Sequence, residues 1–196
     1  IHLEQNVLQE NVGIQDQIAA AHGGLNLLEF DQGGAISVRP VSLPASKISK
    51  FQDHMLLFYT GISRFSSDIA GETIKNIPAK ATDLRTLREM VNQAVQMLQE
   101  DTDFEEFGRL LDESWQLKRM LTNRVTTEQI DEVYYRAINA GALGGKLLGA
   151  GGGGFMLFIA APEFHDRLRN ALSDLLYVPF QIDFTGSQVV YYNPST

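Results

Sequence analysis

The 196-residue sequence contains no cysteine, a single tryptophan and no apolar run that approaches the roughly 20 residues of a membrane-spanning helix. The lack of cysteine excludes a disulfide framework and a thiolate-ligated metal site. The four histidines show no spacing typical of metal ligands, so no metal site is predicted within the sequence itself. We expect a cytoplasmic protein with no membrane partner.

Basic residues are also in short supply. Lys and Arg number 16 against 24 Asp and Glu, which gives a net charge of −8. Partners such as nucleic acids and anionic membranes favour basic surfaces, so this balance argues against both. It leaves room for a local basic pocket that binds a phosphate group. Hydrophobic residues make up 44% of the chain, an ordinary value for a globular protein.

The pattern of apolar residues predicts an α+β protein, with a small, mostly antiparallel sheet covered by helices. Residues 42–54 read as a connection between two units, and a Thr-x-x-Gln capping box from Thr126 to Gln129 predicts the start of a helix. Trp115 falls at core spacing on its helix. The expected strands are 25–30, 35–41, 55–60, 155–161, 178–184 and 187–192, and the expected helices are 14–24, 63–76, 82–100, 103–121, 126–141 and 162–176.

Glycine is concentrated in one stretch, "GALGGKLLGAGGGGF", which covers residues 141–155 and holds eight of the 17 glycines. Glycine permits positive φ and lets another backbone or a phosphate approach where a Cβ would stand. Two explanations stay open: a tight turn with close packing, or a loop whose amides bind a phosphate. The order of residues excludes the phosphate-loop and dinucleotide-binding signatures, because Lys146 precedes most of the glycines and the stretch leads from a helix into a strand.

The segment "GGKLLGAGGGGF" resembles the third conserved motif of the GHMP kinases, the superfamily of galactokinase, homoserine kinase and mevalonate kinase. "VGIQDQIAAAHGG" is similar to the family segment that carries the catalytic aspartate, which would be Asp16. "LLFYTGISRFSSDI" and "FGRLLDESWQLKRML" resemble the branch of D-glycero-D-manno-heptose 7-phosphate kinases in particular. The resemblance covers essentially the whole sequence in the same order.

The resemblance implies an ATP-dependent kinase in which Asp16 faces the acceptor hydroxyl. It implies a substrate-binding group and a second group on the phosphate or nucleotide side. The first group is Gly13, Gln15, Thr60, Gly61 and Arg64, and the second is Lys146, Gly149, Ala150, Gly151, Gly152, Gly153 and Gly154.

Several of these residues also have simpler interpretations. Asp16 lies in the first turn of a short helix, where a carboxylate interacts favourably with the helix N-terminus. Arg64 offers a guanidinium fork for a phosphate, or it is a surface residue near a capped helix start. Lys146 reaches a phosphate, or it is a solvated lysine at a strand edge.

The sequence departs from the family in one respect, because it lacks the Gly-Ser-rich loop that wraps the ATP phosphates. The family's Mg²⁺ ligands would lie upstream of Ile1 together with that loop. We therefore expect residues 1–45 to be the end of a truncated N-terminal catalytic domain and residues 46–196 to be the C-terminal domain. The chain alone is then an incomplete enzyme.

The predicted reaction is transfer of a phosphoryl group from ATP to the anomeric hydroxyl of D-glycero-D-manno-heptose 7-phosphate. One alternative is a kinase for a free sugar such as fucose or galactose. Another is a non-catalytic sugar-binding or accessory domain, because the ATP phosphate loop is absent from this sequence. A homodimer is compatible with each of these.

Overall fold

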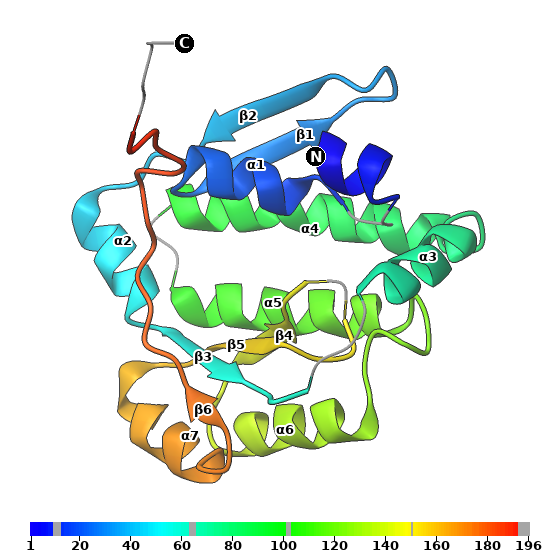
Figure 1. Cartoon of the computed structure of the whole chain (residues 1–196). Coiled ribbons are helices and arrows are strands. Elements are labelled where there is room, and N and C mark those ends of the chain that lie inside the picture. The colour runs from blue at the N-terminus through cyan, green and yellow to red at the C-terminus, as the bar shows by residue number, and fades with distance from the viewer. Residues whose placement is uncertain (10–12, 63–65, 101–102, 150, 192–196) are drawn as a thin grey trace.

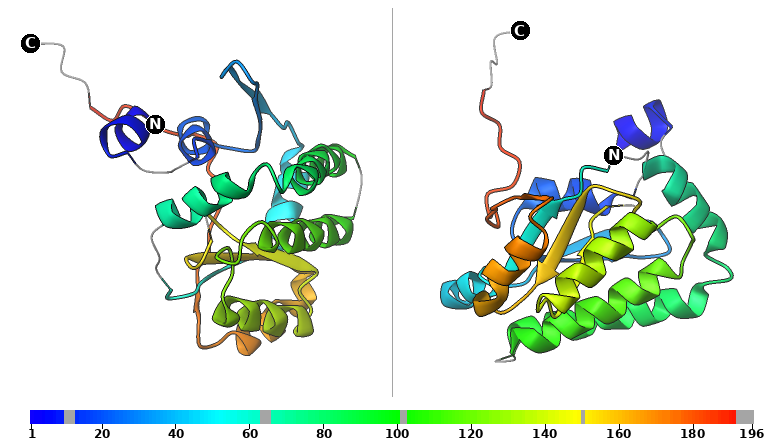
Figure 2. Two further views of the ribbon diagram at one scale, coloured as in Figure 1. Left: turned by 90° about the vertical axis from the view of Figure 1, so that its right-hand side faces the viewer. Right: turned by 90° about the horizontal axis from the view of Figure 1, so that it is seen from below.

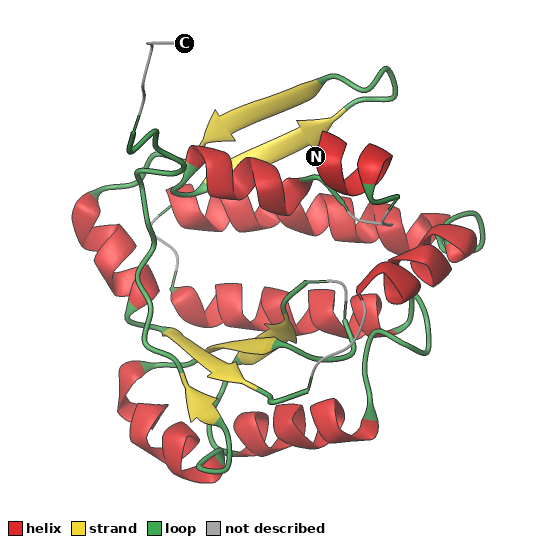
Figure 3. Ribbon diagram, in the orientation of Figure 1, coloured by secondary structure: helices red, strands yellow, loops and turns green. Residues whose placement is uncertain are grey.

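The computed structural model describes residues 1–9, 13–62, 66–100, 103–149 and 151–191. Helices and strands are mixed along the chain, as Figures 1 and 3 show. The elements in order are η1 (Leu3–Val7), α1 (Gln15–His22), β1 (Asn26–Phe30), β2 (Ile36–Pro40), α2 (Ala45–Gln52), β3 (Met55–Tyr59), α3 (Ser66–Asn76), α4 (Ala81–Gln99), α5 (Phe104–Arg119), α6 (Glu128–Asn139), β4 (Gly144–Leu147), β5 (Phe155–Ile159), η2 (Pro162–Phe164), α7 (His165–Ala171) and β6 (Leu176–Tyr177).

The strands form two antiparallel sheets, which confirms the predicted fold class. One is the β1–β2 hairpin, and the other has the strand order β4-β5-β3-β6. In the larger sheet, Leu57 of the central strand β3 pairs with Leu157 of β5, which in turn pairs with Lys146 of β4. Lys146 therefore projects from the same face of the sheet as these two leucines.

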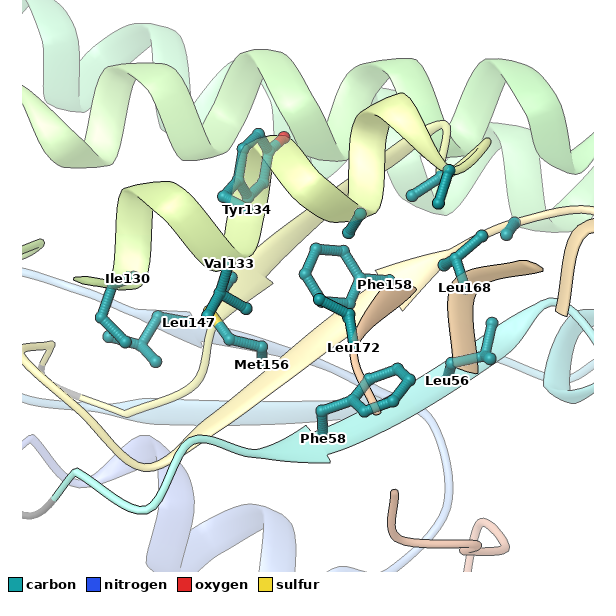
Figure 4. Close-up of a cluster of buried hydrophobic side chains, with 14 of the residues drawn as sticks. Leu56, Phe58, Ile130, Val133, Tyr134, Leu147, Met156, Phe158, Leu168 and Leu172 are labelled. Atoms are coloured by element: carbon teal, nitrogen blue, oxygen red, sulfur yellow. The ribbon is translucent and has the colours of Figure 1, made fainter. Parts of the chain in front are cut away.

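The main hydrophobic core lies between this sheet and helices α6 and α7 (Figure 4). Phe58, Met156 and Phe158 point from the sheet toward this core and are almost completely buried. Helix α5 packs along β4 on the other side of the sheet, and α4 lies beyond it, as two further views show (Figure 2). The sheet is thus covered on one face by α6 and α7, while α5 covers the β4 edge of the other.

A second, smaller core joins the β1–β2 hairpin to the helices. Val41 follows β2 and packs in one cluster with Phe51 of α2 and Leu98 of α4. Phe104 of α5 completes the buried part of this cluster. The segment that carries α1, β1 and β2 is in this way held against α4 and α5.

Two predicted boundaries near the middle of the chain were wrong. The segment expected to be a connection forms the helix α2, whose Phe51 is buried in the smaller core. The cap of α6 is Thr127 rather than Thr126, since Thr127 Oγ1 accepts a hydrogen bond from the Ile130 amide at 3.2 Å. Thr126 instead donates to the Asp131 carboxylate.

The C-terminal strands expected at 178–184 and 187–192 are not strands in the described residues. The polypeptide leaves the short β6 and runs along the molecule toward α1 (Figure 1). Two of its amides bond to residues of helices instead of strands: Ile182 N–H donates to Gln52 Oε1 and Ser187 N–H to the Ala21 carbonyl. The alternating apolar residues Val189 and Tyr191 are exposed. A period-two pattern did not produce a strand here because the segment pairs with a helix end instead of a neighbouring strand.

Candidate functional site

A cavity of about 700 Å³ opens between α4 and α5 and extends to α1 and β4. Its walls are mainly apolar side chains of α4 and α5, among them Met90 and Trp115. Its polar groups come from three elements: Gln15 of α1, Ser114 and Lys118 of α5, and Lys146 of β4. A largely apolar cavity with a few convergent polar groups is typical of a small-molecule site.

Two glycines bring α5 and β4 together at this cavity. A Cβ on Gly144 would lie 2.0 Å from the Gly108 carbonyl oxygen, and a Cβ on Gly108 would lie 2.6 Å from the Leu143 Cβ. Side chains at these positions would push the helix away from the strand. The glycine stretch of the sequence therefore contains a strand as well as a loop, which corrects the expectation that it is a loop throughout. Lys146 is a half-buried residue of that strand rather than a solvated edge lysine.

The two lysines that line the cavity interact electrostatically with one carboxylate, that of Asp16. Burial, together with the positive charge of Lys146, lowers the pKa of Lys118 to about 8, while Asp16 acts in the opposite direction. Burial also lowers the pKa of Lys146, and Asp16 again opposes that change. The Lys118 Nζ donates a hydrogen bond of 2.8 Å to the Gly149 carbonyl oxygen. The structure thus brings together charged side chains from three elements: Asp16 from α1, Lys118 from α5 and Lys146 from β4.

Asp16 is the second residue of α1 and has an exposed side chain. The N-cap of this helix is Ile14, which makes no side-chain capping bond. Gln15, the first residue of α1, lines the cavity, so the N-terminus of this helix lies beside it. Asp16 can therefore interact favourably with the helix N-terminus and also act near the cavity. Gly13 is exposed just ahead of the helix.

The glycines after Lys146 serve close packing with two neighbouring segments. The Gly152 amide donates to the Val125 carbonyl at 3.0 Å, and the Gly154 amide donates to the Ile62 carbonyl at 2.9 Å. A Cβ on Gly153 would lie 2.4 Å from the Ile62 carbonyl oxygen. The amides of Gly152 and Gly154 are therefore already used within the protein, which favours the packing explanation at these two positions.

The start of the loop is different. Gly149 has a φ of +75°, and a Cβ there would meet nothing within 4 Å. Gly151 has a φ of +121° and lies against Val125. The prediction for Ala150 falls outside the described residues. The part of the loop next to Lys118 is thus the part with open space.

Thr60 ties the end of β3 to the glycine loop. Its Oγ1 donates to the Gly154 carbonyl at 2.8 Å and accepts from the Gly154 amide at 3.2 Å. Gly61 has a φ of +71° with open space around it. Arg64, also predicted to contact the substrate, lies outside the described residues. A substrate-binding role for Thr60 and Gly61 stays a prediction.

Sequence reasoning did not single out Lys118. The signal was present, because Leu111, Ser114 and Lys118 follow one another at helical spacing along the same face of α5. A lysine in line with an apolar helix face faces the interior, not bulk solvent. Trp115 is completely buried, as its spacing predicted, and stacks near Tyr134, whose hydroxyl donates to Asp112 at 2.5 Å.

Among the described residues, no three His, Cys, Asp or Glu side chains lie close enough together to hold a metal ion. No helix in the same part of the chain is long and apolar enough to cross a membrane. The Mg²⁺ expected from the resemblance is not tested by this result.

Comparison with known families gives a match over the middle and end of the chain. The family described as "GHMP kinases C terminal" matches residues 79–178. The chain belongs to the GHMP kinase family. The matched region contains helices α4, α5 and α6 and the strands of the larger sheet except β3.

Individual GHMP kinases extend the similarity. A D-glycero-alpha-D-manno-heptose 7-phosphate kinase from Campylobacter jejuni is 31% identical over 87% of this chain and 52% of its own length. An L-fucokinase/L-fucose-1-P guanylyltransferase from Bacteroides fragilis is 33% identical over 88% of this chain and 18% of its own length. The chain thus spans about half of the first of these relatives and a smaller part of the second.

Solved structures agree with this assignment. A D-glycero-D-manno-heptose 1-phosphate kinase from Bacteroides thetaiotaomicron superposes with a TM-score of 0.63 at 28% identity, over 94% of this chain and 51% of that chain. A mevalonate kinase from L. major in complex with R-mevalonate gives a TM-score of 0.66 at 22% identity, over 88% of this chain and 53% of that one. The second likeness shows the fold alone.

Proposed function

We propose that this chain is the C-terminal part of an ATP-dependent sugar-phosphate kinase. The proposed reaction transfers a phosphoryl group to the anomeric hydroxyl of D-glycero-D-manno-heptose 7-phosphate, in the bacterial cytoplasm. Residues 1–45 would complete the N-terminal domain, and residues 46–196 would form the C-terminal domain. The observation that carries the proposal is that Lys118 and Lys146 line one cavity and both interact electrostatically with Asp16, in a chain similar to a heptose 7-phosphate kinase.

The proposed chemistry requires positioning and charge stabilisation more than covalent help from the protein. Asp16 would accept a hydrogen bond from the acceptor hydroxyl, orient it and take its proton as the new bond forms. The ammonium groups of Lys118 and Lys146 would balance negative charge on the phosphate groups. ATP supplies the phosphoryl group, and Mg²⁺, held by residues outside this chain, would neutralise the nucleotide phosphates.

A second candidate acceptor is a free sugar. The similarity to a bifunctional L-fucokinase, at 33% identity, supports it. The two candidates differ in one chemical feature, because only the heptose 7-phosphate carries a phosphate group before the reaction. A cavity with two lysines favours the phosphorylated acceptor.

The test is release of ADP by the protein that carries this chain, including any sequence that precedes Ile1. Heptose 7-phosphate, free heptose, fucose and galactose would be compared at equal concentrations. We expect turnover of heptose 7-phosphate alone. Turnover of fucose or galactose would assign the free-sugar reaction, and no turnover of any of the four would favour a non-catalytic sugar-binding domain.

A further inference from the structure

Lys118 and Lys146 are partly buried but, among the described residues, have no acidic side chains in ion-pair contact, which is unusual in a protein of net charge −8. In the described part of the chain, neither Lys118 nor Lys146 forms an ion pair. Among the residues that the structure describes, the one acidic group that acts on both is Asp16, which is exposed and belongs to another element. The two ammonium groups therefore repel each other without full compensation in the ligand-free protein.

The fold holds this arrangement in place. The contact between Gly108 and Gly144 fixes β4 against α5, and it places Lys146 two residues further along the strand. Lys118 lies at the other end of the same helix–strand contact and is tied to the loop by its bond to Gly149. Because close packing of α5 against β4 holds the two positive charges near each other, a bound anion would offset their repulsion.

The donors at the cavity match one chemical group. Lys118 retains two N–H donors after its bond to Gly149, Lys146 has no hydrogen-bond partner among the described residues, and Gln15 adds a side-chain amide. These donors come from three elements, and a phosphate monoester presents three terminal oxygens. The apolar walls of the cavity lower the local dielectric constant and so strengthen each charge interaction.

We propose that Lys118 and Lys146, with Gln15, form a binding site for a terminal phosphate group in the cavity between α4 and α5. This inference rests on the proposed function and deepens it by assigning residues to the phosphate. The phosphate belongs to the acceptor sugar or is the terminal phosphate of the nucleotide, and the experiment separates these sources. The lysines act as point charges on flexible stems, so each binds a different oxygen.

The experiment measures binding by calorimetry in the absence of turnover, with the protein that carries this chain. The ligands are inorganic phosphate, heptose 7-phosphate, free heptose and a non-hydrolysable ATP analogue. The variants are Lys118→Met and Lys146→Met, and the matched control is Lys75→Met on the exposed side of α3. Thermal unfolding of each variant checks that the fold is kept.

We expect each of the two cavity variants to bind heptose 7-phosphate at least about tenfold more weakly, which is the loss typical of a hydrogen bond to a charged group. Binding of free heptose and the behaviour of Lys75→Met should stay unchanged. A matching loss for the ATP analogue, with heptose 7-phosphate unaffected, would support the site and assign it to the nucleotide. Equal binding of every ligand by all variants would overturn the proposal.

Two features keep the result interpretable. Lys146→Met leaves the bond between Lys118 and Gly149 intact, so its effect does not arise from a released loop. Binding and turnover are measured separately. Lysine-dependent phosphate binding without turnover of any sugar would refute the proposed kinase reaction and support the phosphate site. Turnover of heptose 7-phosphate with unchanged binding in both variants would support the kinase reaction and refute the phosphate site.

Discussion

Gly144 of β4 lies so close to Gly108 of α5 that a Cβ on Gly144 would stand 2.0 Å from the Gly108 carbonyl oxygen. The same hypothetical atom would be 2.8 Å from the Asp112 amide nitrogen. Both neighbours are backbone atoms of a helix, which cannot rotate away as a flexible side chain would. This contact sets the distance between the strand that carries Lys146 and the helix that carries Lys118.

Gly144→Ala should therefore destabilise the protein by about 1–3 kcal/mol, the usual cost of overpacking a close contact. It should also weaken phosphate binding, because the helix and strand must separate. Chemical denaturation measures the first effect and calorimetry the second. The control is Gly33→Ala, where the added Cβ meets only the flexible Asp31 side chain at 3.3 Å or more. A free energy of unfolding equal to that of the control would show that α5 and β4 adjust freely.

Asp16→Asn should lower kcat for heptose 7-phosphate by about 10²–10⁴-fold, the range typical of general acid–base groups. The amide keeps the size of the carboxylate but cannot take the acceptor proton. ATP affinity should change little, since Asp16 is assigned to the acceptor. Steady-state kinetics with both substrates varied would measure these effects. An unchanged kcat would remove Asp16 from the catalytic role and leave its interaction with the helix N-terminus.

The parts predicted correctly from sequence depend on local patterns. Helices α4 and α5 follow from apolar residues at helical spacing, and β1 and β2 lie within the strands expected at 25–30 and 35–41. Lys118 was missed because its importance arises from proximity to Lys146 and Asp16, which are distant in sequence. The C-terminal segment was misassigned because its partner is the end of α1, 167 residues earlier, and such pairing leaves no local pattern.

The affinity for heptose 7-phosphate should fall as the pH rises above about 8. The pKa of Lys118 is lowered to about 8 by burial and by the charge of Lys146, so this ammonium group loses its proton there in the free protein. The phosphate is a dianion throughout, because its second pKa is about 6. The dissociation constant should be nearly constant between about pH 6.5 and 7.5 and then rise by up to tenfold per pH unit.

Lys118→Met provides the control for this pH profile. The variant should bind more weakly at pH 7 and lose the part of the pH dependence that begins near 8. The part of the pH dependence caused by Lys146, whose pKa is also lowered by burial, should persist in this variant. An identical profile in the variant and the parent protein would show that Lys118 does not titrate in contact with the ligand.

Thr60 offers a test between a structural and a substrate-binding role. Its hydroxyl bonds to the carbonyl and the amide of Gly154. Thr60→Ser keeps those bonds and should retain stability and KM. Thr60→Val loses them and should cost about 0.5–1.5 kcal/mol, because the Gly154 amide and carbonyl keep their backbone partners in Ile62 and Thr60. Thermal unfolding with steady-state kinetics measures both. A rise in KM for the sugar in Thr60→Val without loss of stability would assign the hydroxyl to the substrate.

The C-terminal segment packs against the end of the helix that carries Asp16, and Gly186 lies at this contact. A Cβ on Gly186 would lie 2.4 Å from the Ala21 carbonyl oxygen, and the residue has a φ of +64°. Gly186→Ala should lower both stability and kcat, because α1 is displaced. Gly34→Ala is the matched control, since Gly34 has a φ of +84° with nothing within 4 Å of an added Cβ, and it should cost only about 1 kcal/mol of backbone strain. The free energy of unfolding and kcat are measured for both variants. Equal losses in Gly186→Ala and Gly34→Ala would mean that the loss arises from positive φ alone and that the C-terminal segment does not position α1.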